Sequence, residues 1–200
     1  MTFFMPHPPL FIITGPSGAG KSTVVDAILK VKSQKSKVKS LRKFVTCTTR
    51  PKRPGERNGK DYWFLTRQRF ERDIKDGWFF EHAEVYGNLY GSSRREMEKL
   101  LKGRTPVIGI LDVQGAKTVK KLYPDAFVIF LDAPKACLVR RIRTRHVAPA
   151  ELKRRIAKME KEKKFKKTFD LVIMNSDGKL DATIKKVETA IKRKCHPERA

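Results

Sequence analysis

Short apolar runs and amphipathic segments alternate along the chain, with polar stretches between them. The expected strands lie at residues 10–13, 44–46, 107–111, 127–131 and 171–174. Between these strands, apolar residues recur three or four positions apart, which predicts amphipathic helices. The helical spacing covers 24–29, 114–122, 136–143, 152–159 and 180–191. Strands that alternate with helices predict an α/β fold: a doubly wound, mostly parallel sheet of about five strands, with helices on both faces and a binding site at the strands' carboxyl ends.

Residues 47–92 interrupt this alternation and predict a small mixed α/β insert. Within it and just after it, we expect strands at 62–65 and 78–85, a turn at 86–91, and helices at 67–75 and 94–101. The expected turn is rich in glycine and asparagine, which tolerate the backbone angles of tight turns. A Pro-, Gly- and Arg-rich stretch at 48–62 is unsuited to a core element and indicates a functional loop on a rigid frame.

Length and composition favour one soluble domain. A chain of 200 residues with 40% hydrophobic content can bury a substantial core. Residues 1–10 have no basic start and are broken by prolines, and no apolar run approaches the ~20 residues of a membrane span. The three cysteines, Cys47, Cys137 and Cys195, lack the spacing of a zinc or redox site, so we expect them reduced. These features predict an unexported, cytoplasmic protein without membrane association.

The formal net charge of +25 invites comparison with nucleic-acid-binding proteins. The basic residues are spread along the chain, and the aromatic residues at 62–64 and 78–80 lie outside the lysine runs. A stacking platform for bases is therefore not evident. Most of the lysines fit a solvated surface, and those near a phosphate site would attract anionic nucleotides. We expect nucleic-acid binding to be incidental at most.

One motif organises the rest of the chain. After the strand at 10–13 comes the pattern G-x-x-x-x-G-K-[ST], formed by Gly15, Pro16, Ser17, Gly18, Ala19, Gly20, Lys21, Ser22 and Thr23. In this strand-to-helix context the pattern is a P-loop, whose backbone N–H groups and helix N-terminus cradle the phosphates of a nucleoside triphosphate. Lys21 adds a positive charge, and Ser22 offers a hydroxyl to a Mg²⁺ ion.

An acidic candidate for metal binding follows the buried strand at 107–111. Asp112 lies at the carboxyl end of that strand, which places it beside the P-loop in a doubly wound fold. It is a candidate partner of Mg²⁺ through water.

Four motifs together resemble guanylate kinases, which transfer the γ-phosphoryl group of ATP to GMP. They are residues 15–23; Thr48-Thr49-Arg50 with Arg53, Glu56 and 58–62; Phe80-Glu81 with 87–92; and 111–115. The resemblance covers 10–119, with a looser match to the end. It implies one domain over 1–200, with a core of 1–46, 93–137 and 170–200, a GMP-binding lobe at 47–92 and a helical lid at 138–169.

The resemblance also implies roles for residues on the GMP side. Arg50 and Arg53, with the hydroxyls of Tyr62 and Tyr90, would hold the GMP phosphate, since forked guanidinium donors match a phosphate dianion. Glu81 would accept hydrogen bonds from guanine N1–H and N2–H₂, which adenine cannot supply. The remaining GMP-binding residues implied are Thr46, Glu56, Ser92 and Asp112.

On the ATP side, the resemblance implies that Lys21, Arg50, Arg141 and Arg145 act in catalysis. Arg141 and Arg145, with Arg155 as a weaker candidate, belong to an arginine-rich segment that resembles the lid over ATP. Arginines there would stabilise charge on the transferring group and exclude water. Asn175 and Arg145 would join residues 15–23 in binding ATP. The expected reaction is ATP + GMP = ADP + GDP with Mg²⁺, and dGMP is a further candidate substrate; a monomer and a homodimer are both compatible.

Three departures from the family's pattern stand out. Ile110 replaces the first acid of the Asp-x-Asp that often ends the third strand, which leaves Asp112 alone. Thr46 stands where serine is usual, and residues 146–149 form a less polar, shorter lid tip. The change at Ile110 affects how the metal or the guanine edge is supported. The change in the lid tip affects the adenine contacts and the closure of the lid over ATP.

Other functions remain open from the sequence. A catalytically silent guanylate-kinase-like binding module would bind GMP without phosphoryl transfer, but such modules typically lose P-loop residues, and Lys21 and Ser22 are both present. A P-loop kinase for another phosphorylated metabolite, such as a ribose bisphosphate, is a third reading, which Glu81 disfavours. A substrate panel separates these readings.

Overall fold

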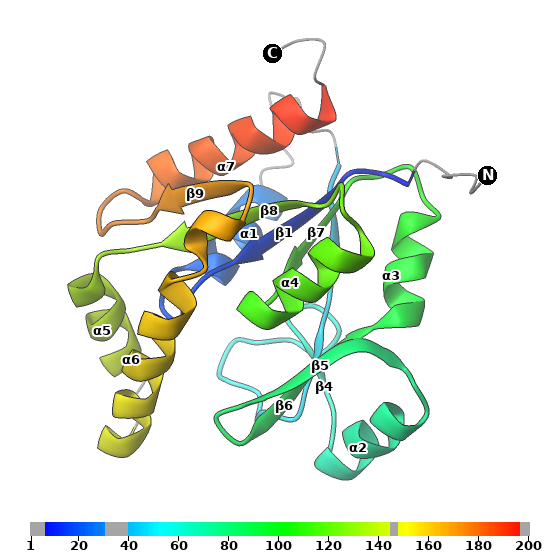
Figure 1. Ribbon diagram of the computed structural model, residues 1–200, viewed down its shortest axis with the longest axis horizontal. Coiled ribbons are helices and arrows are strands. Elements are labelled where there is room, and N and C mark those ends of the chain that lie inside the picture. The colour runs from blue at the N-terminus through cyan, green and yellow to red at the C-terminus, as the bar shows by residue number, and fades with distance from the viewer. Residues whose placement is uncertain (1–6, 31–39, 145–147, 197–200) are drawn as a thin grey trace.

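The computed structural model describes residues 7–30, 40–144 and 148–196. Its main sheet has five parallel strands in the order β2-β7-β1-β8-β9. The strands are β2 (Arg42–Phe44), β7 (Val107–Ile110), β1 (Leu10–Thr14), β8 (Phe127–Asp132) and β9 (Leu171–Met174). The predicted doubly wound α/β fold is confirmed, with the first strand in the middle of the sheet as its all-buried sequence requires (Figure 1).

Helices cover both faces of this sheet because alternate residues of its strands point to opposite sides. On one face Phe11 and Ile13 of β1 pack with α1 (Lys21–Lys30) and α7 (Leu180–Cys195). On the other face Leu10 and Ile12 pack with α3 (Arg94–Leu101) and α4 (Val113–Leu122). The sheet therefore lies between the two groups of helices (Figure 1), with one layer of core on each face.

The insert forms a second, four-stranded sheet in the order β4-β3-β6-β5. Its elements are β3 (Cys47–Thr48), β4 (Trp63–Phe64), α2 (Arg67–Lys75), β5 (Phe79–Val85) and β6 (Asn88–Ser93). Phe70 of α2 stacks on Phe79 with ring centroids 4.5 Å apart, and both belong to a small core shared with Cys47 and Leu89. The insert therefore has a hydrophobic core of its own.

Two expectations for this region were wrong in detail. The turn predicted at 86–91 is confined to Tyr86 and Gly87, because residues 88–93 continue as β6 and pair with β5. The strand predicted at 44–46 ends at Phe44, and the chain re-enters a strand only at Cys47, in the other sheet. Local turn propensity was overridden in the first case by pairing along the β5–β6 hairpin.

Two helices extend from the carboxyl side of the main sheet, opposite the insert. They are α5 (Lys135–Arg143) and α6 (Pro149–Lys163), and a short 3-10 helix (Lys166–Thr168) leads on to β9 (Figure 1). Leu138 of α5 and Met159 of α6 are buried in the core and anchor the pair. In the part of the chain that the structure describes, no helix is long and apolar enough to cross a membrane.

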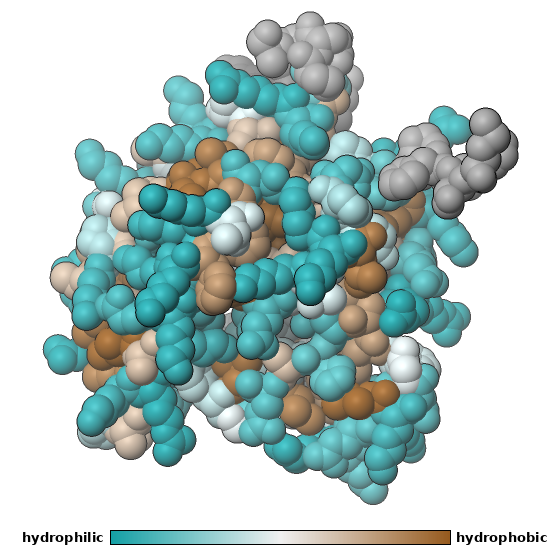
Figure 2. Space-filling model, in the orientation of Figure 1, coloured by the Kyte–Doolittle hydropathy of each residue, from teal (hydrophilic) through white to brown (hydrophobic). Residues whose placement is uncertain are grey.

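One face of the molecule is covered mainly by hydrophilic side chains (Figure 2). Figure 2 shows hydrophilic side chains over most of one face, with hydrophobic ones visible only in small areas. All three cysteines are free, and Cys47 is buried in the core of the insert, where burial raises the pKa of its thiol to about 12. This thiol stays protonated at neutral pH and acts as a small core residue.

Candidate active site

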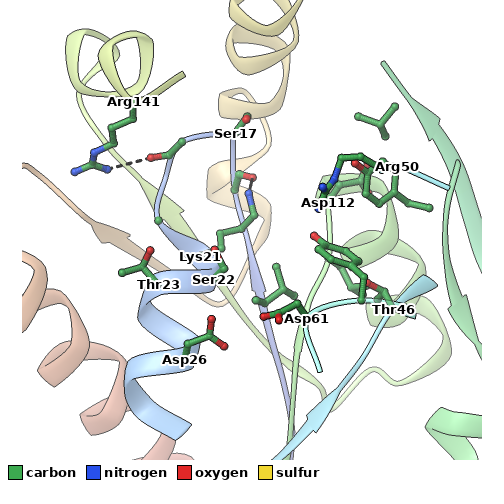
Figure 3. A pocket seen from close by; sticks show the side chains of 18 of the residues that line it. Ser17, Lys21, Ser22, Thr23, Asp26, Thr46, Arg50, Asp61, Asp112 and Arg141 are labelled. Atoms are coloured by element: carbon green, nitrogen blue, oxygen red, sulfur yellow. Dashed lines mark hydrogen bonds between the residues drawn. The ribbon is translucent and has the colours of Figure 1, made fainter. Parts of the chain in front are cut away.

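A cleft of about 700 Å³ lies between the P-loop, the insert and α6. Most of the site residues singled out in the sequence line it, including Lys21, Arg50 and Glu81. Figure 3 shows Lys21 between Arg141 on one side and Arg50 with Asp112 on the other. Residues as far apart in the chain as Gly15 and Leu180 thus line one cavity, since the carboxyl ends of β1 and β7 and the inner side of the insert open into it.

The P-loop wraps the end of β1 in a conformation that only glycine adopts easily. Gly15 has φ 133°, and a Cβ on it would lie 2.1 Å from the carbonyl oxygen of Leu131. Gly20 has φ 87°, and a Cβ there would lie 2.4 Å from the amide nitrogen of Asn175. These glycines let the backbone turn tightly at the N-terminus of α1, where its N–H groups and dipole favour an anion.

The side chains of Lys21 and Asn175 both donate hydrogen bonds to carbonyl groups of the loop. The Lys21 ammonium donates to the carbonyls of Gly15, at 2.6 Å, and Pro16, at 3.0 Å. Asn175 is 3% exposed and donates its amide to the carbonyl of Ala19 at 2.8 Å, while Thr183 donates to its Oδ1. Asn175 lines the cleft, and its side-chain bonds go to the P-loop and to α7.

Arg141 joins the same loop to the end of the sheet. Its guanidinium donates to the carbonyls of Gly18 and Asn175, at 3.1 Å and 2.9 Å, and forms an ion pair with Asp177 at 2.8 Å. Asp177 also pairs with Arg140. Sequence reasoning did not identify Asp177, because its partner lies 36 residues away and only the fold brings them together. Arg145 lies outside the described residues.

Across the cleft, Arg50 is fixed by Glu56 and by aromatic rings. Its Nη2 lies 2.8 Å from Glu56 Oε1, and its Cζ lies 5.4 Å from the Tyr62 ring and 5.7 Å from the Phe64 ring. Glu56 Oε2 accepts a hydrogen bond from the amide of Arg53. Burial opposes ionisation of Glu56, but the bonds from Arg50 and Arg53 outweigh it and lower the Glu56 pKa. Glu56 thus orients the Arg50 side chain and holds the backbone at Arg53.

Two tyrosines complete this cluster. The rings of Tyr62 and Tyr90 meet edge to face at 6.1 Å, and both line the cleft with Arg50 and Arg53. Burial raises the pKa of Tyr62, so its hydroxyl remains a donor at neutral pH. The cluster presents two guanidinium groups and two hydroxyls to the cleft, which is the donor set expected for a phosphate dianion.

Glu81 lies deeper in the cleft, on β5, and is supported by the paired strand. Ser92 is fully buried and donates a short hydrogen bond to Glu81 Oε1. Ser92 therefore supports Glu81 from behind and does not itself line the cleft. Of the predicted P-loop residues, Pro16 and Ala19 also do not line it. Burial, with the charge of Asp112 adding to it, raises the pKa of Glu81 to about 7. Thr46, also buried, lines the cleft nearby.

Asp112 ends the loop after β7 and begins α4. Its Oδ1 accepts from the amide of Gly115 at 2.9 Å, which caps the helix, and its Oδ2 lies 3.6 Å from the ammonium of Lys158. Ile110, which replaces the first acid of the family's Asp-x-Asp pattern, also lines the cleft but is apolar. One carboxylate oxygen of Asp112 thus has a structural role, and the other faces a cation.

Several cleft residues were missed from the sequence. They are Asp26, Lys43, Asp61, Tyr86, Lys158 and Glu162. Lys43 pairs with Asp26 of α1 at 3.0 Å and lies 4.0 Å from Asp61 of the insert. Asp61 lies within the motif at 58–62 but was assigned no role, and Tyr86 stands in no motif. The other four offered only their charge, which did not distinguish them from the many solvated lysines and acids of the chain.

Comparison with known proteins agrees with this geometry. The guanylate kinase family model matches residues 8–194. A guanylate kinase of Symbiobacterium thermophilum is 40% identical over 86% of this chain and 82% of that protein, and one of Rubrobacter xylanophilus is 41% identical over 84% and 86%. The crystal structure of guanylate kinase from Anaplasma phagocytophilum superposes with a TM-score of 0.70 and 26% identity, over 93% of this chain and 85% of that one. The chain belongs to the guanylate kinase family.

Proposed function

We propose that this protein transfers the γ-phosphoryl group of ATP to GMP, giving ADP and GDP. The observation that carries the proposal is that one cleft joins the P-loop, the Arg50–Tyr62–Tyr90 cluster and the Glu81 carboxylate. Direct transfer requires donor and acceptor phosphates to be held in line in one cavity, since both are anionic and repel each other. Family membership supports the same reaction.

On the donor side, residues 15–23 would bind the ATP phosphates. The N–H groups of the loop and Lys21 would stabilise negative charge there as the bond to the leaving ADP breaks. Arg141 contacts the loop already, and with Arg155 and Arg145 it would lie near the transferring group. The supporting feature is the hydrogen bond from Arg141 to the carbonyl of Gly18, which holds the guanidinium beside the P-loop.

On the acceptor side, Arg50, Arg53, Tyr62 and Tyr90 would hold the GMP phosphate in line with the donor. Glu81 would read guanine, with Thr46, Ser92 and Asp112 supporting it. An ionised carboxylate accepts from both N1–H and N2–H₂ of guanine, whereas it would face the N1 acceptor of adenine. The phosphate acceptor is ionised near neutral pH, so the reaction needs no protein base or nucleophile.

Mg²⁺ fits the donor set of this cleft. Ser22 exposes its hydroxyl on α1, and Asp112 directs Oδ2 to the cleft. Among the described residues no group of three acidic, histidine or cysteine side chains could hold a metal alone, which suits an ion bound mainly by phosphates and water. We propose that Ser22 directly, and Asp112 through water, hold Mg²⁺. When bound, the ion would neutralise charge on the β- and γ-phosphates.

Each part of the chain has its own role in the proposed reaction. Residues 47–92 would form the GMP-binding lobe, 138–169 the lid, and 1–46, 93–137 and 170–200 the core. The supporting features are the separate sheet and core of the insert and the position of α5 and α6 at the opposite wall of the cleft. The lobes of such an arrangement close on their substrates and exclude water.

A coupled assay of ADP formation tests the proposed function. With ATP and Mg²⁺, we expect ADP formation to depend on added GMP and to be much slower with AMP, CMP or UMP. Turnover of ATP that GMP does not change, or equal rates with AMP, would contradict the proposal. Tight binding of GMP without ADP formation would support a silent binding module.

A further inference from the structure

The helix α6 presents four charged side chains to the cleft or its rim on one face. Glu151, Arg155, Lys158 and Glu162 are spaced four, three and four residues apart, so they lie in a row along the helix. Arg155 is an expected lid arginine and pairs with Glu151. Lys158 lies one turn further along and lines the same cleft, but neither the motifs nor the proposed roles above include it.

Lys158 contacts two carboxylates that line the same cleft. Its Nζ lies 3.6 Å from Asp112 Oδ2 and 3.6 Å from Glu162 Oε1. Glu162 and Asp112 both line the cleft, as do Lys21 and Arg50. Lys158 therefore shares one cavity with the P-loop lysine and with the arginine of the acceptor side.

The ammonium of Lys158 is held loosely. Both carboxylate distances exceed the 2.7–2.9 Å that is typical of a charge-assisted hydrogen bond. Its side chain is 31% exposed, and the flexible stem of lysine lets the charge move by rotation about its bonds. A phosphate dianion entering the cleft would attract this group more strongly than two distant carboxylates do.

A residue of the insert positions Lys158 from across the cleft. The Tyr86 ring lies with its centroid 5.5 Å from Lys158 Nζ and 4.9 Å from Arg155 Cζ. Tyr86 occupies the β5–β6 turn with φ 53°, a conformation that non-glycine residues seldom adopt. The ring of the insert thus contacts both cations of α6, in the geometry of a cation–π interaction.

From this geometry we infer that Lys158 is a further catalytic residue, whose ammonium contacts the phosphoryl group during its transfer between the two nucleotides. The inference rests on the proposed function. A cation at this point would stabilise the charge that spreads over the equatorial oxygens in the transition state. Its location on α6 makes this contact depend on closure of the cleft.

The test compares Lys158→Met with Lys158→Arg and with Lys161→Met, a control on an exposed position of the same helix. The probe is a bridging inhibitor in which five phosphates join adenosine to guanosine, with its affinity measured by calorimetry beside that of GMP alone. We expect Lys158→Met to weaken the bridging inhibitor about 10- to 100-fold and to lower kcat about 100-fold, and to leave GMP affinity within about twofold. Lys158→Arg should restore part of both losses, and Lys161→Met should match the wild type.

Unchanged affinity for the bridging inhibitor in Lys158→Met would overturn the inference, whether or not kcat falls. A lower melting temperature with that unchanged affinity would assign Lys158 a purely structural ion pair with Asp112 and Glu162. Equal loss of GMP and bridging-inhibitor affinity would also contradict it. Failure of the proposed function is distinguishable, because the wild type itself would then form no ADP in response to GMP.

Discussion

The carboxylate of Glu56 holds the guanidinium of Arg50, with Oε1 2.8 Å from Nη2, and its other oxygen accepts from the Arg53 amide. One acid thereby holds the side chain of Arg50 and the backbone of Arg53, the two arginines that the proposal assigns to the GMP phosphate. Because Arg50 also lies against the Tyr62 and Phe64 rings, its rotation is restricted on more than one side. The clamp is formed before any ligand arrives, which reduces the entropy lost on binding.

Replacing Glu56 with Gln should weaken this clamp without removing a cation. The charge-assisted bond is worth about 1.5–3 kcal/mol, so we expect KM for GMP to rise about 10- to 100-fold, with a smaller change in KM for ATP. Steady-state kinetics with each substrate varied would measure this. Glu71→Gln, which breaks an exposed ion pair with Arg67 on α2, is the matched control and should leave both KM values unchanged. Equal increases for ATP and GMP would argue against a role specific to the acceptor side.

Lys21→Met should remove the charge of the P-loop while keeping the length of the side chain. We expect kcat to fall about 100- to 1,000-fold, the range seen when one preorganised donor to a developing charge is lost. Lys30→Met, at the exposed end of the same helix, should retain activity. Circular dichroism would show whether both variants are folded. A Lys21→Met enzyme with nearly full kcat would remove Lys21 from the catalytic set.

The pH dependence of GMP use should report Glu81. Its pKa is raised to about 7 by burial, and only the ionised carboxylate accepts both guanine donors. The favourable form is therefore present above pH 7 and is lost as the pH falls through this value. We expect kcat/KM for GMP to decrease about tenfold per pH unit below 7, since this ratio reports the free enzyme.

The control for this profile is Glu81→Gln. This variant should have a lower kcat/KM for GMP at pH 8, and its pH profile should lack the inflection near pH 7. The remaining inflection, near pH 6, should be that of the GMP phosphate itself. A profile that keeps the inflection in Glu81→Gln would assign the titration to another group.

Asp177→Asn tests the placement of Arg141. Asp177 accepts from Arg141 Nε and Nη2, at 3.0 Å and 2.8 Å, and is partly exposed. Because such pairs contribute about 0.2–1 kcal/mol, we expect a rise of about two- to fivefold in KM for ATP and no change in KM for GMP. Asp181→Asn, in the exposed first turn of α7, is the control. A change confined to KM for GMP would contradict the assignment of Arg141 to the ATP side.

The sequence was most informative where the local pattern is strong. The apolar runs of β1 and β8 and the helical spacing of α7 were predicted close to their observed bounds, since a strand buried on both faces and an amphipathic helix have distinct periodicities. The apolar run of β9 was also predicted correctly, although two of its four residues are exposed. The strand β6 was mistaken for a turn because its Gly and Asn residues are typical of turns. Only pairing with β5, which is not visible from β6 alone, determines its conformation.

Site prediction shows the same limit. Lys21, Arg50 and Glu81 were found because each belongs to a motif, and the structure brings them to one cleft. Tyr86, Lys158 and Glu162 meet there as well, but Tyr86 lies more than 70 residues from Lys158 and neither stands in a motif. Among many lysines, the ones that face a cleft are identified only by the fold.

The most direct measurement follows the phosphorus atom itself. ATP labelled with ³²P at the γ position would be incubated with the protein, Mg²⁺ and unlabelled GMP, and the products separated by chromatography. If the P-loop and the Arg50 cluster hold two nucleotides in line, the label should appear in the β-phosphate of GDP, in amounts equal to the ADP formed. Label that appears only as inorganic phosphate, or in GDP no faster than without the protein, would contradict direct transfer across this cleft.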